Sequence, residues 1–273
     1  MSKRKYQHIA LSFNLVMTIG EDSSDILNTI TQYLNNPKNN YLAPHKFLAI
    51  NGKQADLADN ILTYQARYND ITDIYLYIQK ADFIFLVVDQ LDKSTRSILT
   101  KISLLNQNII LFVKPAQTHN EYQYLKSLAN TLKIYISERE NKQNSTLKMV
   151  YSVISIINLI NKKPITGVDF PDLYFALSEQ PFSCLGISMR TDNQSVEELI
   201  KLALFDTQTN LKNAKYIILF ISADSTFSLG ELYIIWNIIG MQTDNNVNCF
   251  ASFDLAEDSE RRINYIGVLV AGG

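Results

Sequence analysis

The stretch Phe83-Ile84-Phe85-Leu86-Val87-Val88 decides the fold, because an unbroken apolar run of this length suits a strand buried on both faces. Similar runs stand before it at 46–50 and after it at 109–113. Between these runs, Ser23 to Leu34 and Asp73 to Gln79 carry apolar residues at helical spacing. The alternation of buried strands with helices predicts a doubly wound α/β sheet.

Two segments mark the end of this first unit. The run Lys133-Ile134-Tyr135-Ile136-Ser137 alternates between apolar and polar residues, which places it nearer an edge of the sheet. Beyond it, Ser145 is a candidate cap for a helix that contains the apolar run Met149 to Ile160. That helix is apolar almost all round, so we expect protein to enclose it on most sides. Its apolar run is too short to span a bilayer.

The second half of the chain predicts a smaller α/β domain. Its expected strands lie at 183–188, 216–222, 247–252 and 263–270, and its expected helices lie at 197–204 and 229–239. We therefore predict three parts: an α/β domain at 1–144, a central buried helix at 145–165, and a second α/β domain at 166–273.

Composition excludes several classes of function. The formal net charge is -2, which gives no general attraction to nucleic acid or to an anionic membrane. The two cysteines, Cys184 and Cys249, form no CxxC pair and no Cys/His cluster, so neither a disulfide framework nor a zinc site is expected. No apolar signal-peptide core follows the basic N-terminus. We expect a cytoplasmic protein without membrane insertion.

Five segments share motifs with one known family and follow one another in that family's order. They are Phe47–Asn51, Ala81–Phe85, Val168–Asp172, Ala214–Leu232 and Arg262–Gly272. The family that they resemble is FtsZ, the bacterial relative of tubulin. The resemblance implies a nucleotide-binding α/β domain, a long central helix and a second α/β domain, in agreement with the reading of the apolar runs.

The chain departs from this family where the family holds GTP. Family members place glycines after the first strand, because the backbone must approach phosphate without a Cβ in the way. Here only Gly20 remains, and the carboxylates of Glu21 and Asp22 follow it. Asn51 is followed by Gly52 instead of the family's acidic residue. Only 9 residues of the whole chain are Gly, against the roughly 7% of average usage.

The second glycine loop is also missing. Its place is taken by residues 91–97, which include Asp92, Lys93, Ser94 and Arg96. Lys93 and Arg96, with Lys114, would contact phosphates through their side chains if nucleotide still binds. In the alternative interpretation, this segment is an ordinary helix start that Asp92 or Ser94 caps. We therefore expect a degenerate nucleotide cleft without cofactor or metal, in which GTP or GDP binding stays an open alternative.

One functional element of the family is retained. In FtsZ, a loop after the central helix carries two acidic residues that act on the GTP of the neighbouring subunit, and Asp169 and Asp172 match those positions by resemblance. Gly167 replaces the family's Asn. In the alternative interpretation, Asp169 only caps the helix that begins near Pro171. No catalytic residue is expected to act within the chain's own subunit.

Three functions remain open. The first is a pseudo-GTPase of bacterial cell division or the cytoskeleton that binds, modulates or caps FtsZ-type filaments. The second is an FtsZ-like protein that binds nucleotide, polymerises by self-association and hydrolyses GTP weakly. The third is a structural oligomer that has lost polymer function, since one fold can serve unrelated functions. The family's C-terminal partner-binding tail is not expected in this chain.

Overall fold

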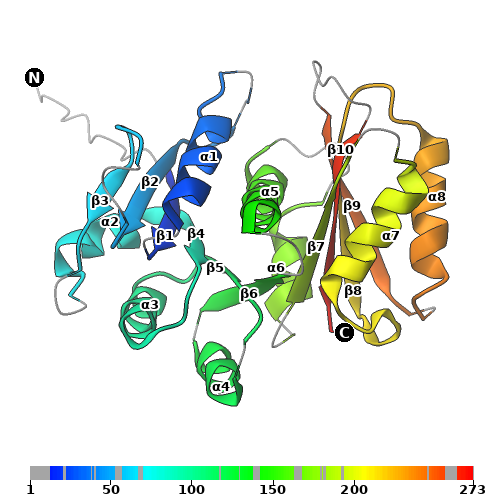
Figure 1. Cartoon of the computed structure of the whole chain (residues 1–273). Coiled ribbons are helices and arrows are strands. Elements are labelled where there is room, and N and C mark those ends of the chain that lie inside the picture. The colour runs from blue at the N-terminus through cyan, green and yellow to red at the C-terminus, as the bar shows by residue number, and fades with distance from the viewer. Residues whose placement is uncertain are drawn as a thin grey trace, which may run out of the picture.

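One ten-stranded sheet organises the chain in the computed structural model (Figure 1). The structure describes residues 13–20, 23–37, 39, 41–52, 57–66, 70–116, 118–128, 130–137, 142–162, 168–178, 180, 183–191, 194–244, 246–255 and 263–272. The strands are β1 (Phe13–Ile19), β2 (His45–Ile50), β3 (Leu62–Tyr64), β4 (Ala81–Val88), β5 (Ile109–Val113), β6 (Thr131–Ile136), β7 (Ser183–Met189), β8 (Tyr216–Ala223), β9 (Asn248–Leu255) and β10 (Ile263–Ala271).

The helices connect these strands. They are α1 (Ser24–Leu34), α2 (Tyr75–Gln79), α3 (Lys93–Leu105), α4 (His119–Ser127), α5 (Lys142–Asn161), α6 (Phe170–Ser178), α7 (Val196–Thr207) and α8 (Leu229–Gly240). Two 3-10 turns span Thr72–Ile74 and Leu211–Asn213. No helix among the described residues is long and apolar enough to cross a membrane.

The strand order is β3-β2-β1-β4-β5-β6-β7-β10-β8-β9. We call β1–β6 the first half-sheet and β7–β10 the second half-sheet. All pairs in the first half-sheet are parallel. In the second half-sheet, β10 lies between β7 and β8 and runs antiparallel to both, while β9 runs parallel to β8. Burial on both faces explains the continuous apolar runs, since β5 is buried at every position.

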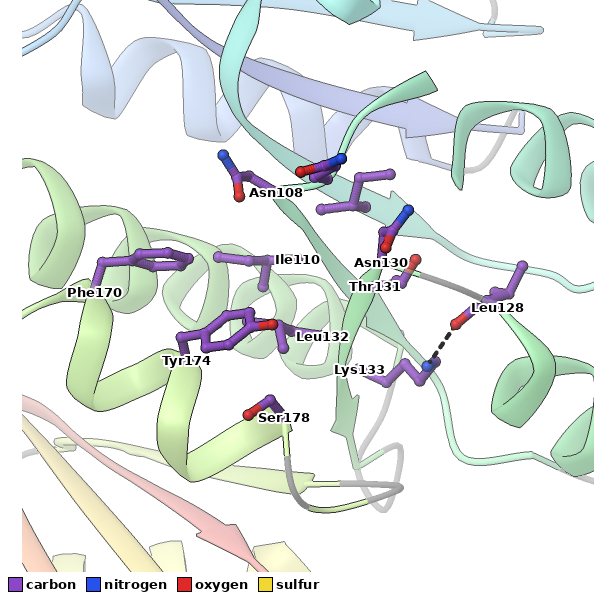
Figure 2. Close-up of a pocket in the computed structure, with 12 residues that line it drawn as sticks. Asn108, Ile110, Leu128, Asn130, Thr131, Leu132, Lys133, Phe170, Tyr174 and Ser178 are labelled. Carbon is purple, nitrogen blue, oxygen red and sulfur yellow. Dashed lines mark hydrogen bonds between the residues drawn. The ribbon is translucent and has the colours of Figure 1, made fainter. Parts of the chain in front are cut away.

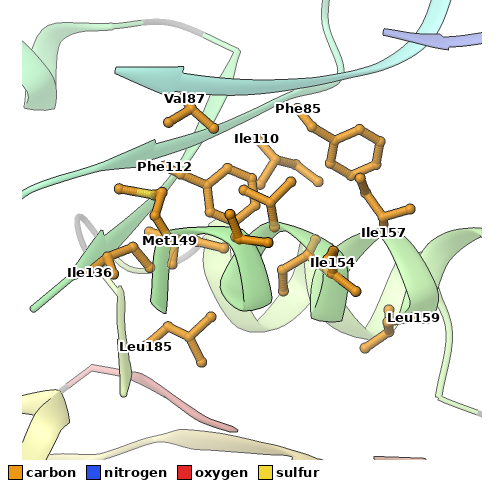
Figure 3. Packing of buried hydrophobic residues seen from close by; sticks show 14 of the residues in the cluster. Phe85, Val87, Ile110, Phe112, Ile136, Met149, Ile154, Ile157, Leu159 and Leu185 are labelled. Atoms are coloured by element: carbon orange, nitrogen blue, oxygen red, sulfur yellow. The ribbon is translucent and has the colours of Figure 1, made fainter. Parts of the chain in front are cut away.

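Three hydrophobic clusters define the layers. The helices α2, α3 and α4 cover one face of the first half-sheet, and α1 covers the other. The helices α7 and α8 cover the outer face of the second half-sheet. Between the two half-sheets lies α5, whose side chains share one cluster with residues of both (Figures 1 and 3). In Figure 3, Ile110 and Phe112 contact α5 from one side and Leu185 lies on the other.

The predicted α/β fold is confirmed, and the enclosed helix is found. It begins at Lys142, so the expectation that Ser145 caps it was wrong, because Ser145 lies inside α5. Val153, Ile156 and Ile157 of α5 are fully buried. The prediction for residues 133–137 was wrong, because β6 lies in the interior of the sheet between β5 and β7. Its pairing with β7 covers only Ile134–Ile136, so its amino half, which includes Lys133, has no strand partner on that side among the described residues. The division at 144 and 165 remains a prediction, and the sheet continues across it.

Candidate functional site

A polar pocket of about 510 Å³ lies where the strands of the first half-sheet end. We call it the carboxyl-edge pocket. Its lining residues are Ile19, Gly20, Asn51, Gln65, Asp89, Gln90, Asp92, Ser94 and Thr95. These residues follow β1, β2, β3 and β4 or begin α3. The chain crosses from β1 to β2 on one side and continues with β4 on the other, so the pocket lies at the topological switch point of a doubly wound sheet.

The carboxylate of Asp92 occupies the start of α3. Its Oδ1 accepts a hydrogen bond of 2.7 Å from the backbone N–H of Thr95. The N-terminus of a helix offers free N–H groups and a partial positive charge, which makes it a natural place for a phosphate. Here the protein supplies its own anion at that place. Of the two alternatives for residues 91–97, the geometry shows the helix start, and the capping residue is Asp92.

The cations predicted from the sequence do not line this pocket. Arg96 donates from Nε to the carbonyl of Leu91 at 2.7 Å and forms an ion pair of 3.3 Å with Glu121. Lys114 forms an ion pair of 2.7 Å with Asp89, and so neutralises one of the two carboxylates among the described lining residues. Lys93 is exposed on α3 and is not among the lining residues. Among the described residues, the lining of the pocket therefore offers a triphosphate the carboxylate of Asp92 and no cation.

The backbone beside the pocket has two unusual conformations. Gly20 has φ +109, which favours glycine, and a Cβ there would meet no atom within 4 Å. Asn51 has φ 58, and its side-chain Oδ1 accepts a hydrogen bond of 2.8 Å from the N–H of Ala66. That contact commits the Asn51 oxygen to the protein itself. Glu21 and Asp22, which we predicted as part of the same cleft, lie outside the described residues.

The predicted acidic loop lies at the opposite edge of the same half-sheet. Asp172 Oδ2 accepts from the N–H of Asp169 at 3.1 Å, and Asp169 Oδ1 accepts from the N–H of Asp172 at 3.3 Å. This reciprocal pair caps the start of α6. Each carboxylate has a second oxygen with no hydrogen bond to the described residues, so capping leaves room for a further contact. Gly167 lies outside the described residues.

The first turn of α6 is fixed to the amino ends of the strands. The ring of Phe170 packs edge-on against Phe83 of β4, with ring centroids 4.5 Å apart. Beside it lies an amino-edge pocket of about 540 Å³ (Figure 2), which α6 and the amino ends of β5 and β6 line. There Lys133 donates from Nζ to the carbonyl of Leu128 at 3.0 Å, and burial lowers the pKa of Lys133. Asp169 and Asp172 thus stand at the amino edge, away from the carboxyl-edge pocket.

A parallel half-sheet with a pocket at its switch point defines the class of nucleotide-binding-type α/β folds. No family model and no curated protein matches the sequence. Solved structures do match the fold. A point mutant of FtsZ from M. jannaschii aligns with a TM-score of 0.74 at 12% identity, covering 96% of this chain and 91% of that one.

Two further structures match over similar lengths. A GTPγS-bound protofilament of CetZ2 from Haloferax volcanii aligns with a TM-score of 0.63 at 11% identity, covering 95% of this chain and 93% of that one. TubZ from Clostridium botulinum phage c-st aligns with a TM-score of 0.55 at 14% identity, covering 94% and 91%. The fold of this chain is therefore the FtsZ/tubulin fold, as the motif resemblance implied.

Sequence reasoning found part of the carboxyl-edge pocket. Gly20, Asn51, Asp92 and Ser94, which we assigned to one cleft from the sequence, line this pocket together, whereas Asp89 was missed. Asp89 directly follows the buried run 83–88, and the first residue after a parallel strand lies at the ligand-binding edge, so that signal was present. The other missed lining residues are Ile19, Gln65, Gln90 and Thr95. The described residues contain no group of three or more His, Cys, Asp or Glu side chains that could hold a metal ion.

Proposed function

We propose that this chain is a cytoskeletal protein of FtsZ type that associates with filament subunits through its acidic amino edge and does not hydrolyse GTP. The observation that carries the proposal is the Asp92 carboxylate at the start of α3, where a phosphate would otherwise bind. A phosphate bound at the start of α3 would lie next to this carboxylate, and two adjacent negative charges repel each other. We therefore expect the carboxyl edge to be inactive toward GTP.

The position of the acidic loop supports the other half of the proposal. Asp169 and Asp172 stand at the edge opposite the carboxyl-edge pocket, so this edge can meet a partner without involving that pocket. We propose that it docks on the nucleotide face of an FtsZ-type subunit, where the second oxygens of the two carboxylates lie near the partner's GTP. A subunit that offers one competent edge adds to a filament end and prevents further addition there.

Self-association is the second candidate. Two different edges of one chain can stack head to tail, and such heterologous contacts give open filaments when the rotation does not close. Among the structural neighbours, one is an FtsZ dimer from M. jannaschii and another is the CetZ2 protofilament. In this second proposal the chain polymerises alone. Its polymerisation depends only weakly on nucleotide, because Asp92 lines the carboxyl-edge pocket.

Three measurements test these proposals. Isothermal titration with GTP and with GDP, in the presence of Mg²⁺, is expected to give no heat. Co-sedimentation with GTP-assembled FtsZ filaments is expected to recover the chain and to slow filament turnover. If the chain neither pellets with the filaments nor changes their turnover, the first proposal is wrong; light scattering of the chain alone then decides whether it polymerises by itself.

Matched variants locate the contact. Asp169→Asn and Asp172→Asn, made together, keep an oxygen that can cap α6 but remove both charges. We expect binding to filaments to weaken by about tenfold, the equivalent of 1.4 kcal/mol. Asp25→Asn is the control, since Asp25 is also an exposed residue in the first turn of a helix. Equal binding by both variants would assign the contact to another surface.

A further inference from the structure

A third pocket, of about 270 Å³, lies where the two half-sheets meet. We call it the junction pocket. Its lining residues are Pro115, Ala116, Tyr122, Tyr135, Ser137, Cys184, Thr207 and Gln208. The first five belong to the first half-sheet and its connections, and the last three belong to β7 and to the end of α7. A molecule in this pocket therefore contacts both halves of the protein.

The pocket lies beside a short strand pairing, the one that joins the two half-sheets. β6 and β7 pair through three residues each, whereas β5 pairs with β6 through five and β7 with β10 through seven. Tyr135 and Cys184, both lining residues, are the middle pair of the three. Their neighbours Ile134 and Leu185 belong to the cluster around α5, and alternation along a strand sends Tyr135 and Cys184 to the opposite face.

A side-chain hydrogen bond crosses the same junction. Gln208 ends α7 in a left-handed conformation with φ 56, which is uncommon for a residue other than glycine. Its Nε2 donates to the Oγ of Ser137, directly after β6. The end of α7 is thus tied to the end of β6 beside the pocket, and polar groups stand next to the aromatic ring of Tyr135.

The chemistry of the lining selects the class of ligand. None of the described residues that line the junction pocket carries a formal charge, whereas Lys133 lines the amino-edge pocket and Asp89 and Asp92 line the carboxyl-edge pocket. Burial raises the pKa of the Cys184 thiol to about 11, so this thiol is neutral at physiological pH. Apolar and aromatic lining with a few polar groups is typical of small-molecule sites.

We infer that the junction pocket binds a small, uncharged, mainly apolar molecule with one hydrogen-bonding group, such as a phenol or an indole. Because the ligand contacts both halves, it stabilises the relative orientation in which the pocket is formed, at the expense of other orientations. This inference concerns binding to the single chain and does not depend on filament formation.

Two thiols allow a test on the unmodified protein. Cys184 lines the pocket, and Cys249 lies exposed on β9 as an internal control. The probe is 4-methylphenol, and the readout is the rate of alkylation of each thiol by N-ethylmaleimide, followed by peptide mass spectrometry. At ten times its Kd, the probe is expected to slow the Cys184 reaction about elevenfold by mass action and to leave Cys249 unchanged. Equal rates with and without the probe overturn the inference.

The charge of the ligand and the volume of the pocket give two further, independent tests. 4-Methylbenzoate has the same ring with a carboxylate, and we expect it to bind at least about tenfold more weakly, since burying an unpaired charge is unfavourable. Cys184→Phe fills the pocket and is expected to abolish the rise in melting temperature that 4-methylphenol causes, whereas Cys249→Phe retains it. Equal binding of the two probes would contradict the assignment of the ligand to this pocket. An unchanged rise in melting temperature in a folded Cys184→Phe variant would also contradict it. If Cys184→Phe does not fold, the alkylation rates in the natural sequence decide.

Discussion

The buried ion pair between α5 and α7 leads to a sharp prediction about stability. Lys148 Nζ lies 2.6 Å from Asp206 Oδ1, and the two side chains are only 3% and 8% exposed. The second carboxylate oxygen, Oδ2, accepts from the N–H of Ile187 at 3.1 Å. The pair therefore joins the central helix to α7 and, through the backbone, to β7. Replacing Lys148 with Met keeps the volume of the side chain and leaves Asp206 as a buried charge without its cation.

The expected cost follows from this burial. Breaking a buried pair by removing one partner costs about 3–5 kcal/mol, so Lys148→Met should lower the free energy of unfolding by this amount. Lys201→Met is the matched control, because Lys201 also pairs with a carboxylate, Glu197, but both side chains are more than half exposed. An exposed pair four residues apart on a helix contributes about 0.3–0.5 kcal/mol.

A double variant separates the ion pair from the backbone contact. Lys148→Met with Asp206→Leu removes both charges but leaves the N–H of Ile187 without its acceptor, which costs about 1–3 kcal/mol. Guanidinium denaturation should therefore rank the double variant between Lys201→Met and Lys148→Met. If Lys148→Met loses less than about 1 kcal/mol, or the double variant is the least stable, the assignment of the stabilisation to the pair is wrong.

Three further predictions concern single positions. Burial lowers the pKa of His45 to about 4 from an ordinary value of 6.5, so between these pH values the unfolded chain binds more protons than the folded chain. The free energy of unfolding should therefore fall as the pH falls from 6.5 to 4. His45→Gln should flatten that part of a plot of the unfolding free energy against pH. A Cβ at Gly186 would lie 2.1 Å from the carbonyl oxygen of Ala203, so Gly186→Ala should lower the denaturation midpoint, whereas Gly240→Ala, with no atom within 4 Å, should not. Asp92→Ala should cost about 1 kcal/mol through loss of the cap, and thermal shifts should then show greater stabilisation by inorganic phosphate than in the natural sequence.

The sequence predicted the strands well where burial is complete. The runs at 83–88 and 109–113 are strands because both faces are covered, and no polar position interrupts them. The alternation of polar and apolar residues at 133–137 led to a wrong prediction of a strand near the edge of the sheet. Only the amino half of β6 is open, and its carboxyl half pairs with β7 of the second half-sheet. Pairing between distant strands leaves little trace in local periodicity.

The candidate site was predictable in position but not in detail. The family resemblance placed Gly20 and Asn51 in the cleft, and both directly follow parallel strands, where residues gather at one edge. The side-chain contacts of Arg96 and Lys114 depend on Glu121 and Asp89, which come from other elements. Charge type alone therefore could not show that these cations are already paired with carboxylates of the protein.

The position of β10 has a consequence for how the protein is made. β10 follows β7, β8 and β9 in the sequence, yet it lies between β7 and β8 and pairs with both along its length. During synthesis, β7 and the β8–β9 pair emerge with an unpaired edge each, and neither can complete its ladder until residues 263–271 have been translated. The strands of the first half-sheet pair with one another, and only β6 has a later partner, β7. Emergence of the nascent chain thus sets an order of assembly: the first half-sheet forms early, and the second closes only when its central strand is inserted.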